Sequence, residues 1–166
     1  MRADGRCARP ACAATLLAMR RVLAALDFSA VTGAVVEQAA SLAEAFEAEL
    51  TLIHVAAPDP TFVSYEAGPQ TVRDARAQEL RNEHREIQAL AKDLRGRGLR
   101  AKALLVQGPT VETILREARE LGVDAIVIGS HGHGALFNAL VGGVAQGVLR
   151  DAPCPVVVIR APVAAS

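Results

Sequence analysis

Two periods of hydrophobic and polar residues alternate along the chain. Short runs of leucine and β-branched residues predict strands over residues 22–26, 50–55, 99–106, 125–128 and 156–159. Apolar residues that recur every three or four positions predict helices over residues 31–46, over 72–94, between Gly108 and Gly122, and over 136–149. Strands that alternate with helices are typical of an α/β fold, in which one open parallel sheet carries helices on both faces.

Residues that favour helix ends mark where several of these helices start or stop. Ser29 is the expected N-cap of the first helix. Gly96 and Gly98 end the second helix, and Gly122 ends the third. Between the second strand and the second helix, residues 57–69 include three prolines and one aspartate, which predicts a loop and a candidate lid.

The length of the chain is that of one compact domain, with 166 residues of which 51% are hydrophobic. We expect the domain to span residues 19–162 and to be followed by a flexible C-terminus at residues 163–166. Residues 1–18 have no helix or strand periodicity. We interpret them as a disordered tail, or as an upstream start with Met19 as the working initiator.

Composition argues against several classes of partner. The 18 basic and 18 acidic residues balance, and no basic stripe with interleaved aromatic residues predicts a nucleic-acid partner. No apolar run approaches the roughly 20 residues that span a bilayer, so we expect no membrane partner. The three cysteines, Cys7, Cys12 and Cys154, predict neither a disulfide framework nor a zinc site. We therefore expect a soluble, cytoplasmic protein.

A glycine-rich segment, GSHGHG at residues 129–134, follows the fourth predicted strand and precedes a helix. Open parallel sheets bind ligands at this end of their strands, and the start of a helix favours anions such as phosphate. Taken alone, the segment fits a tight structural turn equally well. His131 and His133 fit an exposed or phosphate-facing loop better than a metal site, because no carboxylate or cysteine lies at matching spacing. We expect no metal held by the protein.

The spacing of glycines beyond this segment helps to decide between a phosphate-binding loop and a tight structural turn. Gly129-x2-Gly132-x9-Gly142 is followed at once by Gly143 and Val144. Three further blocks accompany this motif, namely VLAALDFS at residues 22–29, LIHV at 52–55 and APCPVVV at 152–158. Each block is unspecific by itself, whereas their order and spacing between residues 20 and 160 are specific. On these residues the chain resembles the universal stress protein family.

The resemblance implies a five-stranded parallel sheet in the strand order 3-2-1-4-5. In the nucleotide-binding branch, this sheet holds ATP or AMP, with or without Mg²⁺, at the carboxyl ends of its strands. In that strand order the fifth strand lies at the sheet edge. Its consecutive β-branched residues predict a homodimer through that strand, because an open apolar edge invites pairing.

The family's nucleotide-binding positions carry over to individual residues. Asp27 matches the position that contacts the nucleoside, and Val55 matches the position whose backbone reads adenine. The two phosphate-side turns match Gly129, Ser130, His131 and Gly132, and then Gly142, Gly143 and Val144.

Gly143 departs from the family pattern, because the ATP-binding branch normally carries Ser or Thr there. A hydrogen bond from such a hydroxyl to a charged group contributes roughly 1.5 to 3 kcal/mol. Three functions stay open: a regulatory module that binds ATP or AMP in a stress response, a nucleotide-free dimeric interaction protein, and a slow ATPase. We assign no catalytic residue, since phosphoryl transfer needs a metal-holding acid, a base and a cationic clamp, and the site offers only Asp27 and His131.

Two polar residues outside the motif are expected to stabilise the fold rather than bind a ligand. His54 ends the second predicted strand and is expected to be a hydrogen-bonded structural residue. Asp124 precedes the fourth strand, at the sheet end away from the site, and is expected to be a turn or cap residue.

Overall fold

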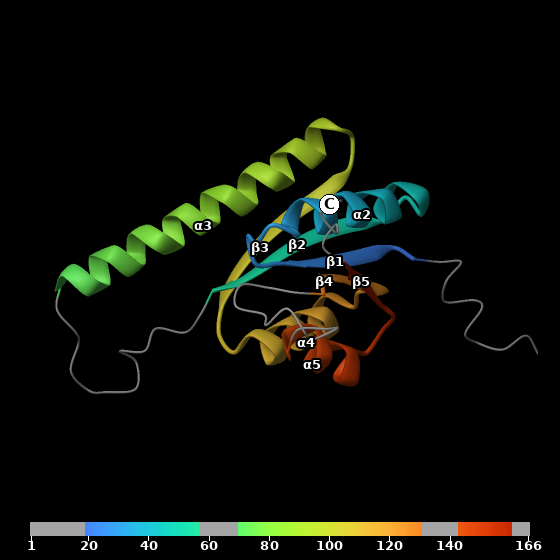
Figure 1. The fold of residues 1–166 in the computed structure, drawn as a ribbon. Helices are drawn as coiled ribbons and strands as arrows, with labels where there is room; N and C mark the ends of the chain where they lie inside the picture. Colours follow the sequence, from blue (N-terminus) through green and yellow to red (C-terminus); the bar gives the residue numbers. More distant parts are fainter. Residues whose placement is uncertain (1–18, 57–69, 131–142, 161–166) are drawn as a thin grey trace, which may run out of the picture.

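Strands and helices alternate in the computed structural model, which describes residues 19–56, 70–130 and 143–160 (Figure 1). Within those ranges the elements are β1 Arg21–Leu26, α2 Thr32–Ala45, β2 Glu49–Ala56, α3 Gln70–Gly96, β3 Arg100–Gln107, α4 Thr110–Leu121, β4 Ala125–Gly129, α5 Gly143–Asp151 and β5 Val156–Ile159. Each of them corresponds to a predicted strand or helix. The expected tail at 1–18, the candidate lid at 57–69, the predicted helix start at 136–142 and the C-terminus from 161 lie outside the described residues.

The strands form one parallel sheet in the order β3-β2-β1-β4-β5. The predicted α/β class and strand order are therefore confirmed. Figure 1 shows α2 and α3 on one face of the sheet and α4 and α5 on the other. β1 pairs with both β2 and β4, so the chain first winds outward from β1 through β2 to β3 and then crosses back to β4.

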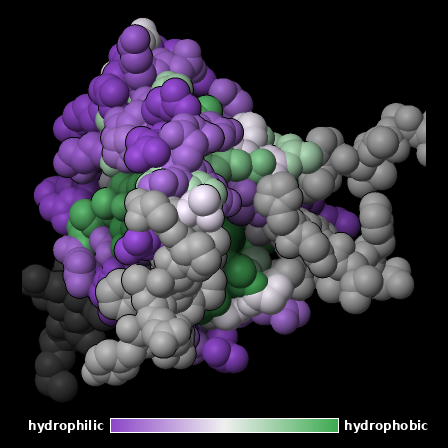
Figure 2. Space-filling view, turned by 90° about the vertical axis from the view of Figure 1, so that its left-hand side faces the viewer, coloured by the Kyte–Doolittle hydropathy of each residue, from purple (hydrophilic) through white to green (hydrophobic). Residues whose placement is uncertain are grey.

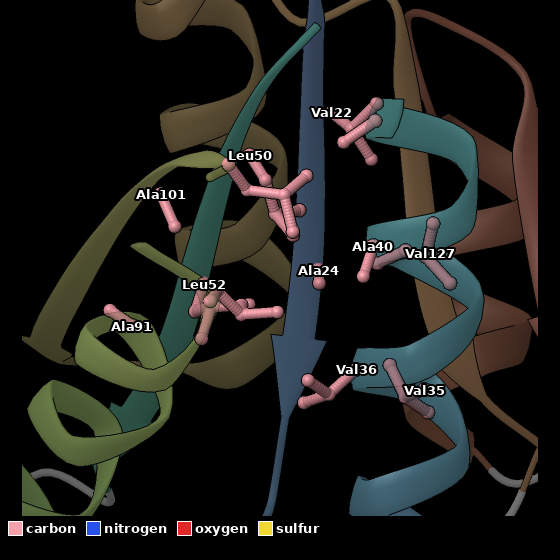
Figure 3. Packing of buried hydrophobic residues seen from close by; sticks show 14 of the residues in the cluster. Val22, Ala24, Val35, Val36, Ala40, Leu50, Leu52, Ala91, Ala101 and Val127 are labelled. Carbon is pink, nitrogen blue, oxygen red and sulfur yellow. The ribbon is translucent and has the colours of Figure 1, made fainter. Parts of the chain in front are cut away.

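Two apolar cores, one on each face, hold the sheet between the helices. Val22 and Ala24 of β1 contribute to the core under α2 and α3, whereas Leu23 contributes to the core under α4 and α5. Figure 3 shows part of the first core, in which Leu52 of β2 and Val36 of α2 lie beside β1. Because β1 and β4 are covered on both faces, they read as continuous apolar runs in the sequence.

The longest helix, α3, has 27 residues and is covered by the sheet along only part of its length. Ile87, Ala91 and Leu94 are fully buried, as the helical period predicts, and Leu80 is half-buried. In Figure 1 the amino-terminal part of α3 extends beyond the sheet, and in Figure 2 hydrophilic residues gather over the upper part of the molecule, where this helix lies. None of the helices in the described ranges is long and apolar enough to cross a membrane.

Asp124 fastens the amino-terminal edge of the sheet. Its Oδ2 accepts hydrogen bonds from the backbone N–H of Arg20, at 2.7 Å, and of Arg21, at 2.9 Å. These bonds hold the start of β1 against the turn that leads into β4. The prediction of a turn or cap residue at this edge is confirmed.

The prediction that Ser29 caps the first helix is wrong. α2 begins at Thr32 after Val31, and no side chain caps it. The chain leaves β1 through a tight turn in which Phe28 has a φ of 55°, and the Ser29 carbonyl, not its hydroxyl, accepts the Thr32 N–H at 3.0 Å. The predicted ends of the next two helices are confirmed, because α3 ends at Gly96 and Gly122 ends α4 in the left-handed conformation.

Candidate functional site

The carboxyl ends of β1, β2 and β4 bring three of the predicted site residues to one level. Leu26 is the register partner of His54, so the next residues, Asp27 and Val55, lie level with each other. Ala25 is the partner of Ile128, so two steps further Asp27 also lies level with Ser130. The chain reverses its winding between β1 and β4, and open α/β sheets bind ligands at such a switch point.

Asp27 is half-buried and already holds one backbone group. Its Oδ1 accepts the N–H of Ser29 at 3.0 Å, which fixes the carboxylate at the end of β1. Among the described residues, no hydrogen bond reaches the second oxygen, Oδ2. A carboxylate oxygen accepts hydrogen bonds only, so this atom suits a hydroxyl or amino donor of a ligand.

Val55 presents a backbone acceptor beside that carboxylate. The carbonyl of the next residue, Ala56, faces β3, because it accepts the N–H of Gly108 at 3.2 Å. Successive carbonyls of a strand point to opposite sides, so the Val55 carbonyl points toward the β1 side. β1 pairs only as far as Leu26, opposite His54. The Val55 carbonyl therefore lies just past the end of the β1 pairing, near Asp27.

Gly129 and Ser130 end β4, and the backbone of Ser130 is engaged within the fold. Gly129 is the register partner of Ile159 in β5. The Ser130 N–H donates to the Ile159 carbonyl at 2.7 Å, and only 1% of Ser130 is exposed. This bond fixes the direction in which the chain leaves β4, and it commits an N–H that a phosphate turn could otherwise use.

α5 carries the last residues predicted for the phosphate end of the site. Among the described residues α5 begins at Gly143, which is followed by Val144 at 40% exposure, and this first described turn contains no acidic residue. The helix returns the chain to the amino end of β5, so its own amino end is directed toward the carboxyl edge of the sheet. A helix dipole with this direction favours a negative ligand at that edge.

Gly143 itself adopts an ordinary backbone conformation. Its φ lies outside the left-handed region, and a Cβ added to it would meet no atom of the described residues within 4 Å. A side chain at this position would therefore be tolerated. The departure from the family pattern is not a requirement of the backbone.

The remaining predicted site residues, His131, Gly132 and Gly142, lie outside the described residues, as does His133. Within the part of the chain that the structure describes, no group of three or more His, Cys, Asp or Glu side chains is placed to hold a metal ion.

His54 is the hydrogen-bonded structural residue that the sequence predicts, and its environment adds two contacts that the sequence analysis missed. Its Nδ1 donates to the Leu26 carbonyl at 2.8 Å, and only 8% of the residue is exposed. The Phe28 ring lies 4.4 Å from the imidazole, between centroids, and Glu83 Oε2 lies 3.7 Å from Nε2. The helical period was a usable signal for Glu83, because this residue lies one turn before Ile87 on the covered face of α3.

Residues 19–160 match the profile of the Universal stress protein family. The universal stress protein YxiE of Bacillus subtilis is 28% identical to this chain over 145 residues, which cover 84% of this chain and 98% of YxiE. The solved structure of hypothetical protein MJ0577, a protein of Methanocaldococcus jannaschii, superposes with a TM-score of 0.74 at 25% identity. The match covers 89% of this chain and 99% of MJ0577.

Two further solved structures of this fold contain a nucleotide. One is a universal stress protein family protein from Arabidopsis thaliana with AMP bound, with a TM-score of 0.62, 20% identity, and coverage of 86% of this chain and 92% of that one. The other is a universal stress protein in complex with cAMP, with a TM-score of 0.60, 19% identity, and coverage of 87% and 99%. The likeness to these two structures shows the fold. The family profile covers the described core from end to end, and the chain belongs to the universal stress protein family.

Proposed function

We propose that the protein is a cytoplasmic regulatory module of the stress response that binds ATP or AMP at the carboxyl edge of its sheet. The observation that carries the proposal is the placement of Asp27 level with Val55 at the switch point between β1 and β4. A residue with a carboxylate and one with an open backbone carbonyl follow the paired ends of β1 and β2 there, and α5 runs antiparallel to the strands, with its amino end toward the same edge.

Each part of an adenine nucleotide has a matching group at this edge. A ribose hydroxyl would donate to Asp27 Oδ2, and the exocyclic amino group of adenine would donate to the Val55 carbonyl. The phosphates would lie at the first turn of α5, beside Gly143 and Val144, where the helix dipole favours them. The AMP and cAMP held by the two related structures support this class of ligand.

The phosphate end distinguishes ATP from AMP less sharply in this chain than in relatives with a hydroxyl at position 143. Gly143 offers a backbone N–H but no side-chain donor. We infer that ATP therefore gains less from its second and third phosphates. Mg²⁺ would reach the site bound to the triphosphate, because the described part of the site offers one carboxylate, Asp27, and magnesium commonly binds through substrate phosphates.

The experiment that tests the proposal is equilibrium dialysis against ATP, AMP and GTP. ATP and AMP are expected to bind, and GTP to bind at least about tenfold more weakly, because guanine places a carbonyl oxygen where adenine carries its amino group, opposite the Val55 carbonyl. Binding of GTP as strongly as ATP would contradict the adenine assignment. Binding of no nucleotide would favour a dimeric interaction protein of the same family.

A homodimer through β5 is the second part of the proposal. β5 lies at one end of the strand order, and its residues Val156–Ile159 are half-buried rather than covered. Val144 and Leu149 of the neighbouring α5 add exposed apolar surface, at 40% and 44% exposure. Pairing of two β5 strands would satisfy the open backbone edge and cover these side chains.

Light scattering at micromolar concentration tests this assembly. The parent is expected at twice the mass of one chain, and Val157→Lys is expected to shift the population toward monomer. Ala89→Lys, on the exposed side of α3, adds the same charge away from β5 and is expected to leave the dimer intact. A monomeric parent would contradict this part of the proposal.

A further inference from the structure

His54 holds the two residues that flank Asp27. Its Nδ1 donates to the carbonyl of Leu26, immediately before Asp27, at 2.8 Å. Its ring lies 4.4 Å from that of Phe28, immediately after Asp27, with the two planes tilted by 40°. Phe28 has a backbone φ of 55°, which residues other than glycine rarely adopt, so contacts around Phe28 must stabilise this turn.

The tautomer of His54 follows from these contacts. A carbonyl oxygen only accepts hydrogen bonds, so Nδ1 must carry a proton. In the neutral ring Nε2 then has a lone pair and no hydrogen. That lone pair faces Oε2 of Glu83 on α3 at 3.7 Å. The carboxylate oxygen also lacks a hydrogen, and among the described residues no hydrogen bond reaches it.

With a neutral His54 ring and an ionised Glu83, neither Nε2 nor Oε2 carries a hydrogen that the other could accept. The Glu83 side chain is 20% exposed and the His54 side chain 10%, so little water can reach the two atoms and supply the missing hydrogen bond. A proton taken up by either group would lie between the two atoms. The contact would then become a charge-assisted hydrogen bond, whose usual length is about 2.7–2.9 Å.

We propose that His54 is a positioning residue for the nucleotide site: it sets the Asp27 turn, and a proton shared with Glu83 locks it to α3. The inference rests on the proposed nucleotide site. We call the hydrogen bond through this shared proton, between His54 Nε2 and Glu83 Oε2, the bridge. When the bridge is formed, α3 holds the imidazole, and the imidazole holds Leu26 and Phe28 on either side of Asp27. Nucleotide affinity is then greater at mildly acidic pH than at mildly alkaline pH.

The charged surroundings of His54 are simple in the described part of the chain. α3 supplies Glu83, which is the one acidic group there within 4 Å of the imidazole. β1 leads into Asp27, and β3 places apolar Leu105 as the register partner of His54. Arg76 lies two turns before Glu83 on α3, where it pairs with Glu79 at 2.5 Å.

Glu83→Gln tests the bridge, because glutamine forms it at any pH. Its amide N–H₂ can donate to the neutral Nε2, and its carbonyl can accept from the protonated ring. The measurement is the affinity for ATP of parent and variant at pH 6 and pH 8, expressed as a ratio at each pH. This ratio cancels the titration of the ATP phosphates. Glu86→Gln removes the same charge from an exposed position on the same helix and serves as the matched control.

The variant is expected to bind ATP about three- to tenfold more tightly than the parent at pH 8, which is the range of one buried hydrogen bond, and about equally at pH 6. The control is expected to follow the parent. A ratio for Glu83→Gln that is the same at both pH values, or that matches Glu86→Gln, would overturn the inference.

Nuclear magnetic resonance of the nucleotide-free protein separates this inference from the proposed function. At pH 8 the His54 ring is expected to carry its proton on Nδ1, and the Ser29 amide, which donates to Asp27, is expected to shift as the pH falls from 8 to 6. A proton on Nε2 at pH 8, or a Ser29 amide that does not respond, would contradict the bridge. If no nucleotide binds but these signals behave as expected, the proposed function fails while the bridge stands.

Discussion

Gly147 of α5 lies directly against Val111 of α4. A Cβ on Gly147 would be 2.9 Å from one γ-methyl group of Val111 and 3.0 Å from the other, closer than carbon atoms normally approach. The two helices pack next to each other on one face of the sheet, and α5 carries Gly143 at its amino end. The spacing of α4 and α5 therefore sets where the proposed phosphate end of the site lies.

Gly147→Ala is expected to destabilise the protein by about 1 kcal/mol. Overpacking costs about 1–3 kcal/mol, and the better helix propensity of alanine returns about 1 kcal/mol of it. Denaturant unfolding measures the change. Adding Val111→Ala to Gly147→Ala is expected to recover most of the lost stability. If Gly147→Ala alone were more stable than the parent, α4 and α5 would be shown to move apart freely.

The amino-terminal edge of the sheet offers a test of stability that leaves the candidate site untouched. Asp124→Ala removes the acceptor of the Arg20 and Arg21 N–H groups, and we expect it to lower the free energy of unfolding by about 1–2 kcal/mol. Asp124→Asn keeps one side-chain oxygen and is expected to lose less. Affinity for ATP should not change in either variant, because Asp124 lies at the opposite edge from Asp27.

Cys154 gives a pH-dependent signal near the same edge. Burial raises the pKa of the Cys154 thiol, and the negative charge of Asp124 adds to that shift. A raised pKa means less thiolate at a given pH, so alkylation by iodoacetamide should reach its half-maximal rate at a higher pH in the folded protein than in urea. Asp124→Asn removes the smaller of the two causes and should move that midpoint part of the way back. Peptide mass spectrometry separates Cys154 from Cys7 and Cys12, and equal midpoints in buffer and urea would contradict the burial.

Gly143→Ser restores the hydroxyl that the ATP-binding branch of the family normally carries. The backbone at Gly143 is compatible with serine and no described residue crowds it, so thermal stability is expected to stay the same. Affinity for ATP should rise about tenfold, because a hydroxyl donor joins the backbone donors at the phosphate end. AMP should gain less. Gly143→Ala adds the Cβ without the hydroxyl, and an equal gain from alanine would show that the hydroxyl does not contact phosphate.

Much of the fold follows from the sequence because hydrophobic burial dominates it. The continuous apolar runs of β1 and β4 are covered on both faces, and the alternation of strand and helix leaves few arrangements open. The strand order came from the family resemblance rather than from periodicity. The start of α2 was misplaced because the chain first makes a left-handed turn at Phe28, whose ring packs on His54 of another strand, and no local signal at Ser29 reveals this.

The candidate site was predictable where it depends on strand ends and less so where it depends on contacts between elements. Asp27 and Val55 come together because parallel strands in register end at the same edge. By contrast, the hydrogen bond that the N–H of Ser130 donates to Ile159 of β5 was not predicted, although Ser130 itself was named for the phosphate side. That bond joins residues 29 positions apart and follows from how far β4 and β5 overlap, which sequence pattern does not specify.

The central claim is that Asp27 binds the ribose of an adenine nucleotide with the oxygen that the fold leaves open. Asp27→Asn keeps the oxygen that accepts the Ser29 N–H and replaces the second oxygen by a donor, so the turn at the end of β1 should survive. Calorimetric titration of parent and Asp27→Asn with ATP, alongside their melting curves, measures the contribution of that one atom. We expect that the parent binds ATP, that the variant binds at least about tenfold more weakly, and that the two proteins melt within a few degrees of each other. Equal affinity of the two proteins for ATP, or no binding by the parent, would contradict it.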